Sequence, residues 1–247
     1  MDLGIAGLTA AVAAGSAGLG LGAAKALVAE GVQVAVCSRD PARVDSAVAA
    51  LGHDAVGIVA DVGTPAGAEG FVSEAISALG RLDILVTNAG GPPPGTFAST
   101  ELAAYQAALE LNLLSTVAMC RAAIPAMQER GWGRVVAITS IGAKEPIGSL
   151  MASSVARAGV TSFVKITARE VAADGVTVNS IQPGLHLTER MKVFGSAEDL
   201  ARGVPTGRAG DPDDFGAAVA FLCSDQAKFI TGTGLLLDGG STAGLFG

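Results

Sequence analysis

Glycine residues gather near the start of the chain in a pattern that suits phosphate binding. An apolar run of strand length, Leu8–Ala13, leads into the loop Gly15–Gly20, and helix-type spacing follows as far as Glu30. Glycine lets a backbone turn sharply and approach a ligand, and a helix start offers free N–H groups and a positive dipole end. The residues that we expect to contact nucleotide phosphates are Gly15, Ser16, Gly18, Leu19 and Gly20.

A nucleotide selector is expected about 20 residues further on, at the end of the next strand. The apolar run Val32–Cys37 ends there in Ser38-Arg39. An acidic residue at this point holds a ribose 2′-hydroxyl, whereas an arginine accommodates a 2′-phosphate. A hydroxyl beside a guanidinium suits a phosphate better than a bare ribose. The pair therefore favours NADP(H) over NAD(H).

Strand and helix patterns alternate along the chain, which predicts an α/β fold. The expected strands are Leu8–Ala13, Val32–Cys37, Ala55–Ala60, Leu82–Thr87, Arg134–Thr139, Val176–Ile181 and Gly234–Leu237. After the glycine-loop helix, the expected helices are Ala42–Leu51, Glu69–Leu79, Glu101–Leu111, Leu113–Arg130, Leu150–Ala173 and Asp211–Ser224, and 182–204 is irregular. The order predicts a Rossmann-type, doubly wound parallel sheet of about seven strands with helices on both faces. We expect a single domain over residues 1–247 because no linker interrupts it.

Ligands of such sheets bind at the carboxyl ends of the strands. This edge gathers several motifs with the glycine loop and the selector. They are Asp61-Val62, Asn88–Gly91, Ser140 and Pro183-Gly184.

The composition narrows the class of protein. Hydrophobic residues make up 50% of the 247 residues but aromatic ones only 4%, which suits helices layered on a parallel sheet. A net charge of −7 without a basic cluster argues against nucleic-acid binding. Cys37, Cys120 and Cys223 are widely spaced, so we expect free thiols in a cytoplasmic protein and no metal site.

The stretch Leu3–Ala24 carries no charge and is long enough to suggest a signal peptide or a membrane span. Its glycines and the acidic start Met1-Asp2 favour a buried strand and nucleotide loop instead. We therefore expect no membrane segment.

In this order and spacing, the motifs resemble those of the short-chain dehydrogenase/reductase family, in particular its 3-oxoacyl-acyl-carrier-protein reductase-like members. The resemblance covers essentially the whole chain. It rests on Gly18-Leu19-Gly20, Asp61-Val62, Asn88-Ala89-Gly90, Asn112, Ser140, Pro183-Gly184 with Thr188, and Asp238-Gly239-Gly240. It implies an oxidoreductase that binds its cofactor at these loops, Ala89, Gly90 and Thr188 included. The family's first glycine falls at Ala14, and Gly15 is expected to take over part of the turn.

The resemblance also implies a catalytic set of Asn, Ser, Tyr and Lys. Asn112 matches the helix residue that holds a water in a proton relay, and Ser140 the residue that binds the substrate carbonyl. The family tyrosine follows that serine by about thirteen residues, and the lysine follows four later. Those two positions hold Ser153 and Arg157.

This replacement changes the acid chemistry. A tyrosine with a pKa of about 10, lowered by a nearby cation, can protonate an alkoxide, whereas a serine hydroxyl is a far weaker acid. Arg157 stays charged and can fork onto the ribose hydroxyls. We therefore expect cofactor binding to persist while the usual acid is lost, which is worth about 10²–10⁴-fold in rate.

Two local groups are candidates to replace the acid. His186 lies on the loop that covers the nicotinamide in the family and could donate a proton, or it simply faces solvent or the cofactor amide. Lys144 and Glu145 follow Ser140 and form either a second candidate or a solvated charge pair.

Three functions compete. The first is an NADP(H)-dependent oxidoreductase with an altered relay, acting on a C=O, C=N or C=C group of a small molecule. An iminium is attractive because it is already protonated. The second is a catalytically silent nucleotide-binding protein. The third is an ordinary 3-oxoacyl-thioester reductase, which the single tyrosine, Tyr105, does not favour.

The helical stretches 101–130 and 150–173 carry few charges. The resemblance implies that they pair subunits into a homodimer or homotetramer. The alternative is that their apolar faces only cover the sheet.

Overall fold

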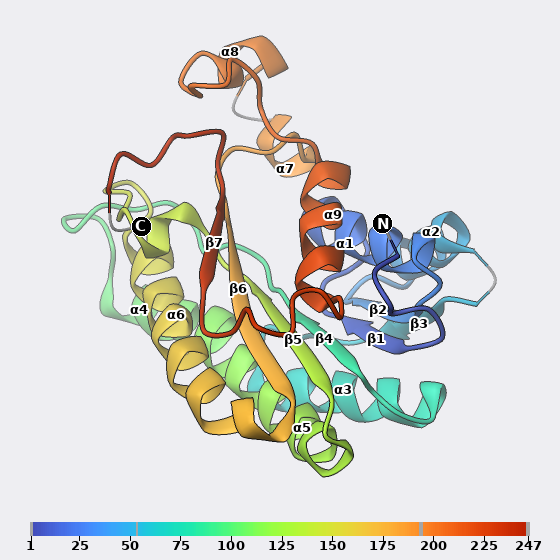
Figure 1. Ribbon diagram of the computed structural model, residues 1–247. Coiled ribbons are helices and arrows are strands. Elements are labelled where there is room, and N and C mark those ends of the chain that lie inside the picture. The colour runs from blue at the N-terminus through green and yellow to red at the C-terminus, as the bar shows by residue number, and fades with distance from the viewer. Residues whose placement is uncertain (1, 53, 193–194, 246–247) are drawn as a thin grey trace.

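A seven-stranded, wholly parallel sheet forms the centre of the molecule (Figure 1). The computed structural model describes residues 2–52, 54–192 and 195–245. The strand order is β3-β2-β1-β4-β5-β6-β7. The strands are β1 (Thr9–Val12), β2 (Gln33–Ser38), β3 (Val56–Val59), β4 (Ile84–Thr87), β5 (Gly133–Ile138), β6 (Val176–Pro183) and β7 (Gly234–Leu237). The order reverses between β1 and β4, so the predicted doubly wound α/β class is confirmed.

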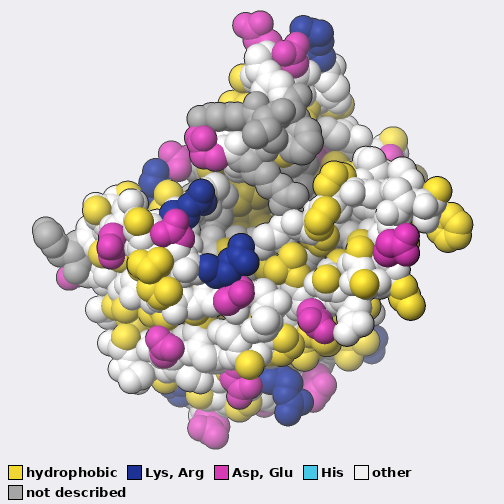
Figure 2. All heavy atoms as spheres, turned by 180° about the vertical axis from the view of Figure 1, so that it is seen from behind, with side chains coloured by type: hydrophobic (Ala, Val, Ile, Leu, Met, Phe, Trp, Pro, Cys, Tyr) yellow, Lys and Arg dark blue, Asp and Glu magenta, His cyan; other side chains and the backbone are white. Residues whose placement is uncertain are grey.

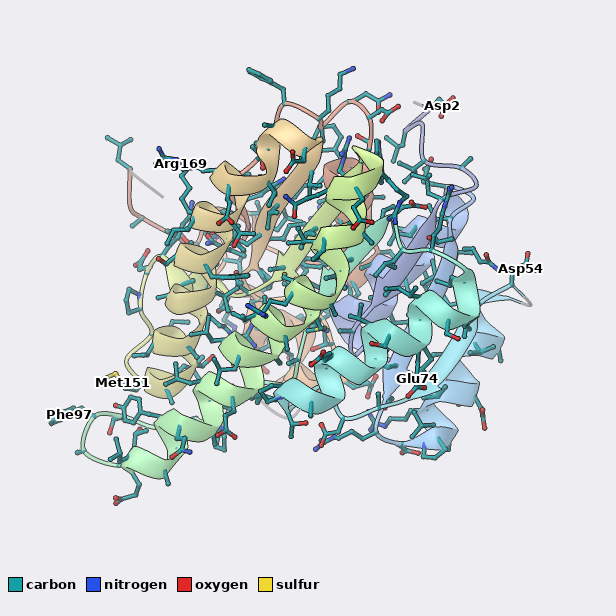
Figure 3. The ribbon with its side chains drawn as sticks, turned by 90° about the horizontal axis from the view of Figure 1, so that it is seen from below. Asp2, Asp54, Glu74, Phe97, Met151 and Arg169 are labelled. Atoms are coloured by element: carbon teal, nitrogen blue, oxygen red, sulfur yellow. The ribbon has the colours of Figure 1, made fainter. Side chains whose placement is uncertain are left out.

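Helices cover both faces of this sheet. The longer ones are α1 (Gly18–Ala29), α2 (Pro41–Leu51), α3 (Pro65–Leu79), α5 (Ser115–Arg130), α6 (Met151–Val171) and α9 (Pro212–Cys223). The short ones are α4 (Leu102–Ala108), α7 (Glu189–Lys192), α8 (Ala197–Ala201) and the single turns η2 (Ile141–Ala143) and η3 (Ala172–Asp174). Apolar side chains of α3, α5 and α6 form the core on one face, and those of α1, α2 and α9 form it on the other. Figure 3 shows the first group side by side across the sheet.

Local sequence explains where several helices begin. The side chains of Asp40, Thr64 and Asp211 each accept a hydrogen bond from a first-turn amide of α2, α3 and α9, and proline follows each cap. The cap at Thr64 starts α3 four residues before the expected Glu69. Helices α1 and α9 cross where Gly22 faces the carbonyl of Pro212 and Gly216 faces the carbonyl of Gly22. Neither glycine leaves room for a Cβ.

Two sequence expectations need correction. The two helices expected over 101–130 form one helical run, α4 to α5, joined by a π-helical turn, η1 (Leu109–Leu114), that contains Asn112. Ser115 and Thr116 donate from their hydroxyls to the carbonyls of Leu111 and Asn112 in this wide turn. The segment expected to be irregular holds the end of β6 and the short helices α7 and α8.

Two apolar stretches find their place in the core. Residues of the uncharged N-terminal stretch form the buried strand β1 and the start of α1. The run 102–130 is long and apolar enough to cross a membrane by length and composition alone. Its buried side chains, such as Met119, Ile124 and Met127, pack against the sheet and α3.

Candidate active site

The glycine loop between β1 and α1 leaves no space for side chains at two positions. A Cβ on Gly20 would lie 2.5 Å from the carbonyl oxygen of Ala14, and one on Gly15 would lie 2.8 Å from that of Val12. Gly18 has a φ of +55° and faces the side chain of Thr188. Helix α1 begins without a capping side chain among the described residues. The tight loop and the uncapped first turn, which includes Leu19, fit a dinucleotide pyrophosphate.

The sharp turn of this loop lies at Ala14 rather than at Gly15. Ala14 has a φ of +46°, and it and Gly18 are the described residues of the loop with left-handed backbone. The amide of Ala14 donates to the Cys37 sulfur over 3.3 Å. Burial raises the pKa of Cys37 to about 12, so it remains a thiol. Gly15 therefore does not take over the turn, because Ala14 itself adopts the positive φ.

The selector residues gather at the ends of β2 and β3. The Nε atom of Arg39 lies 4.0 Å from Asp61 Oδ1, and both side chains are more than half exposed. Ser38 accepts a hydrogen bond from the amide of Asp40. Val62 is buried next to Asp61. An exposed guanidinium beside a hydroxyl at this edge fits a 2′-phosphate.

The loop after β4 is hydrogen-bonded to the glycine loop on one side and to the π-helical turn η1 on the other. Asn88 Nδ2 reaches the carbonyl of Ala14 at 3.5 Å, and Asn112 Nδ2 donates to the carbonyl of Gly90 over 3.0 Å. Ala89 lies between these two anchors. Asn112 Oδ1 is buried and has no hydrogen-bond partner among the described residues, and an orphaned acceptor of this kind can bind a water. Its predicted relay role stays a prediction.

Ser153 and Arg157 lie one turn apart on α6 and are each only 9% exposed. Arg157 donates from Nε to Ser153 Oγ over 3.2 Å. Its Nη1 donates to the carbonyls of Thr139 at 2.6 Å and Ile138 at 3.4 Å. We expected a fork onto ribose hydroxyls, but these two nitrogens are directed onto the end of β5 and onto the serine. Main-chain carbonyls leave no sequence signal, so sequence reasoning missed these anchors.

Ser140 and Ser153 each use an oxygen lone pair on the protein. Ser140 Oγ accepts from the amide of Gly142 over 3.1 Å, as Ser153 Oγ does from Arg157. Each hydroxyl proton can therefore still be donated into the cavity that both residues line. The result is a polar floor of two hydroxyl donors beside a fixed cation.

His186 does not line the cavity that contains Ser140, Ser153 and Arg157. It lines a separate cavity of about 410 Å³, toward the start of α9 and the end of β7. Its Nδ1 lies 3.2 Å from the carbonyl of Gly184, and its ring meets that of Phe215 edge-on at 5.4 Å. Burial lowers its pKa, against the opposing effects of the Gly184 carbonyl, Asp214 and Asp211. The expected stand-in acid therefore faces away from Ser140 and Ser153.

Other residues near the site have structural partners. Glu145 Oε2 accepts from the amide of Ala243, so Glu145 ties the C-terminal segment to the loop after β5. Lys144 is half-buried. Gly184, next to Pro183, packs against Asp238, where a Cβ would lie 2.7 Å from the Asp238 Cα. Amides of Gly240 and Thr242 donate to the Asp238 carboxylate, and its pKa is lowered although burial opposes this.

Comparison with known proteins identifies the family. Residues 13–242 match the family described as Enoyl-(Acyl carrier protein) reductase. "Dehydrogenase/reductase SDR family member 4" of Oryctolagus cuniculus is 33% identical, over 98% of this chain and 96% of that protein. "L-rhamnose 1-dehydrogenase (NAD(P)(+))" of Sphingomonas sp. (strain SKA58) is 34% identical, over 95% of this chain and 96% of that protein.

Among solved structures, L-sorbose reductase from Gluconobacter frateurii, complexed with NADPH and L-sorbose, superposes with a TM-score of 0.93. It is 30% identical, and the match covers 99% of this chain and 100% of that one. The chain belongs to the short-chain dehydrogenase/reductase family of oxidoreductases.

Proposed function

We propose that the chain is an NADP(H)-dependent oxidoreductase that acts on a C=O, C=N or C=C group of a small molecule through a serine–arginine pair. The observation that carries the proposal is the contact between Arg157 and Ser153 at the floor of the cavity beside Ser140. When bound, the cofactor supplies or accepts a hydride. The chain's own residues bind it, orient the substrate and manage the charge that develops.

The cofactor assignment has three supports. The glycine loop fits a pyrophosphate by its steric limits, and the exposed Arg39 with Ser38 fits a 2′-phosphate. A structural relative in the same family is complexed with NADPH. NAD(H) is the alternative, and the affinity for the two nucleotides decides between them.

The serine–arginine pair handles charge differently from a tyrosine–lysine pair. A guanidinium does not give up a proton in proteins, so Arg157 cannot feed a proton relay. It instead orients Ser153 and stabilises negative charge near its hydroxyl. Preorganised donors of this kind can lower the energy of a developing oxyanion. The pair therefore favours substrates whose reduction develops negative charge that a fixed cation can stabilise. An iminium needs no acid, but its positive charge would lie near Arg157.

We also propose that the chain works as a cytoplasmic homodimer or homotetramer. The described cysteines are all free and buried. Apolar side chains stay exposed at Leu114 and, on α6, at Val155 and Ile166, which supports α6 as a pairing surface. Light scattering at micromolar concentration tests the assembly, and a particle of only 24.3 kDa would contradict it.

The function is tested by NADPH titration followed by an NADPH-oxidation screen. The screen covers ketones, 3-oxoacyl thioesters, enones and cyclic imines. We expect NADPH binding and turnover with at least one class. Binding without any turnover would show a silent nucleotide-binding protein, and absence of binding would overturn the cofactor assignment.

A further inference from the structure

The cavity above Ser140 and Ser153 has a volume of about 450 Å³, a size typical of small-molecule sites. Its polar floor consists of Ser140, Ser153 and Arg157, and Arg157 donates to Ser153. Its walls come from the loops after β4, β5 and β6, and most of the wall side chains are apolar. The wall side chains include Pro92, Pro94, Ile147, Leu150, Leu185 and Met191. Figure 2 shows the molecule hollowed at this edge, with hydrophobic side chains in the hollow and on its right side and charged side chains on its left.

Several polar main-chain groups at these walls are hydrogen-bonded within the protein. The amide of Gly95 donates to the carbonyl of Ser149 over 2.8 Å, and the amide of Met151 donates back to Gly95 over 3.1 Å. The amides of Leu150 and Ile147 donate to Ile147 O and Ser154 Oγ. The hydroxyl of Thr139 donates to the carbonyl of Ile181. These groups are therefore committed within the protein, and among the described wall residues the Ser149 side chain adds one further hydroxyl.

From the contrast between the polar floor and the apolar walls, we infer that the substrate is a compact, largely apolar ketone or imine with one polar reactive group, rather than a polyhydroxylated sugar. The inference rests on the proposed oxidoreductase function and names its substrate class. The floor can satisfy one carbonyl or imine, whereas further hydroxyl groups would meet carbon walls. A buried hydroxyl without a partner weakens binding by about 5- to 150-fold. The sugar named for the L-sorbose reductase relative carries several such groups.

A pair of substrates with the same number of carbon atoms tests this directly. We compare cyclohexanone with L-sorbose, and in parallel 2-methyl-1-pyrroline, by NADPH oxidation. An apolar substrate should exceed L-sorbose by at least about 100-fold in kcat/KM. Turnover of L-sorbose at an equal or higher kcat/KM would overturn the inference while supporting the oxidoreductase function.

A binding measurement keeps the inference testable without turnover. Ligand-observed NMR on the protein loaded with NADP⁺ compares the same compounds. Preferential binding of the apolar compounds supports the inference even if no NADPH is oxidised, in which case the proposed function fails alone. Preferential binding of L-sorbose, or equal binding, contradicts it.

A matched pair of asparagine variants tests whether the walls select the substrate. Ile147→Asn places a polar group on the wall, whereas Phe229→Asn changes a residue that is 99% exposed and lies outside both the cavity and α6. The first should lower kcat/KM for the apolar substrate by about 10-fold and narrow its advantage over L-sorbose. The second should leave both unchanged.

An unchanged ratio in Ile147→Asn would contradict the assignment of this wall. Met191→Thr repeats the test from the loop after β6 and decides the matter if Ile147→Asn does not fold. Equal shifts in Ile147→Asn and Phe229→Asn would also contradict the inference, because the change would not come from the cavity.

Discussion

The edge formed by the carboxyl ends of the strands has two halves, one for the nucleotide and one for the substrate. The two halves differ in where they depart from the sequence pattern of the family. The nucleotide half, at β1 to β3, departs from the family pattern at Ala14 but keeps the left-handed turn there. The substrate half, at β4 to β6, has Ser153 and Arg157 where the sequence resemblance predicts the family's tyrosine and lysine, and Arg157 donates to Ser153 and to the carbonyl of Thr139 at the end of β5.

The difference follows from the groups that each half uses, backbone groups for binding phosphate and a particular side chain for transferring a proton. A phosphate is held largely by backbone amides and by space that glycine leaves open, and a backbone shape tolerates an alanine at a modest energetic cost. A proton relay depends on the acidity and reach of a particular side chain. The same edge can therefore retain cofactor binding while its acid chemistry changes.

The largest effect should come from filling the nucleotide loop. In Gly20→Ala the new Cβ would lie 2.5 Å from Ala14 O and 3.0 Å from Asn88 Nδ2. Overpacking costs about 1–3 kcal/mol, so the Kd for NADPH should rise by up to about 100-fold in calorimetric titration. The control Gly70→Ala, in open space on α3, should leave the Kd unchanged. An unaltered Kd in Gly20→Ala would remove the loop from the phosphate site.

Removing the Arg39 guanidinium should separate the two nucleotides. Arg39→Ala loses a charged contact to the 2′-phosphate, which exposure to solvent weakens. The Kd for NADPH should rise about 10-fold while that for NADH stays constant. Arg43→Ala, another exposed arginine, is the control. Equal losses for both nucleotides would contradict the selector assignment.

His186 should affect stability rather than proton supply. Its lowered pKa means that the unfolded chain binds more protons just below pH 6.5. Its contribution is therefore complete above about pH 6.5 and declines as pH falls, by at most about 1.4 kcal/mol per pH unit. Urea unfolding of His186→Gln should lack this part of the decline, which the wild-type protein should show. The pH profile of NADPH oxidation should survive in His186→Gln, and its loss would reinstate His186 as a proton donor.

The smallest effect concerns the strained alanine. A non-glycine residue in left-handed backbone costs about 1–2 kcal/mol, partly offset by the greater unfolded-state freedom of glycine. Ala14→Gly should raise the free energy of unfolding by up to about 1 kcal/mol in urea titration. Ala49→Gly, on the exposed face of α2, should lower it by about 1 kcal/mol. A loss of stability in Ala14→Gly would mean that the φ of +46° is not strained.

Much of the fold could be predicted from the sequence because strand and helix periods are local properties. The seven strands follow from short apolar runs, and their shared edge follows from topology. The start of α3 was missed because the Thr64 cap, not the apolar pattern, sets it. The π-helical turn at Asn112 leaves no signal in the apolar spacing either. The hydroxyls of Ser115 and Thr116 donate to main-chain carbonyls in this turn, and such contacts do not change the hydrophobic pattern.

The candidate site was predictable in its residues but not in their directions. Ser140, Ser153 and Arg157 do lie together at one cavity. The direction of Arg157 depends on the carbonyls of β5, and that of His186 depends on Phe215 and on Gly210, where a Cβ would lie 2.6 Å from the imidazole. Such contacts join distant segments, so spacing along the chain does not reveal them.

The central claim is that the substrate half lacks the family acid while the rest of the site is in place. Ser153→Tyr with Arg157→Lys restores that acid, and the cavity beside Ser153 gives the tyrosine room. The decisive measurement is kcat/KM for a simple ketone with saturating NADPH, in wild type, Ser153→Ala and this double variant. We predict that the double variant exceeds wild type by about 10²-fold or more. A wild type that equals the double variant, between pH 5.5 and 8.5, would contradict the claim.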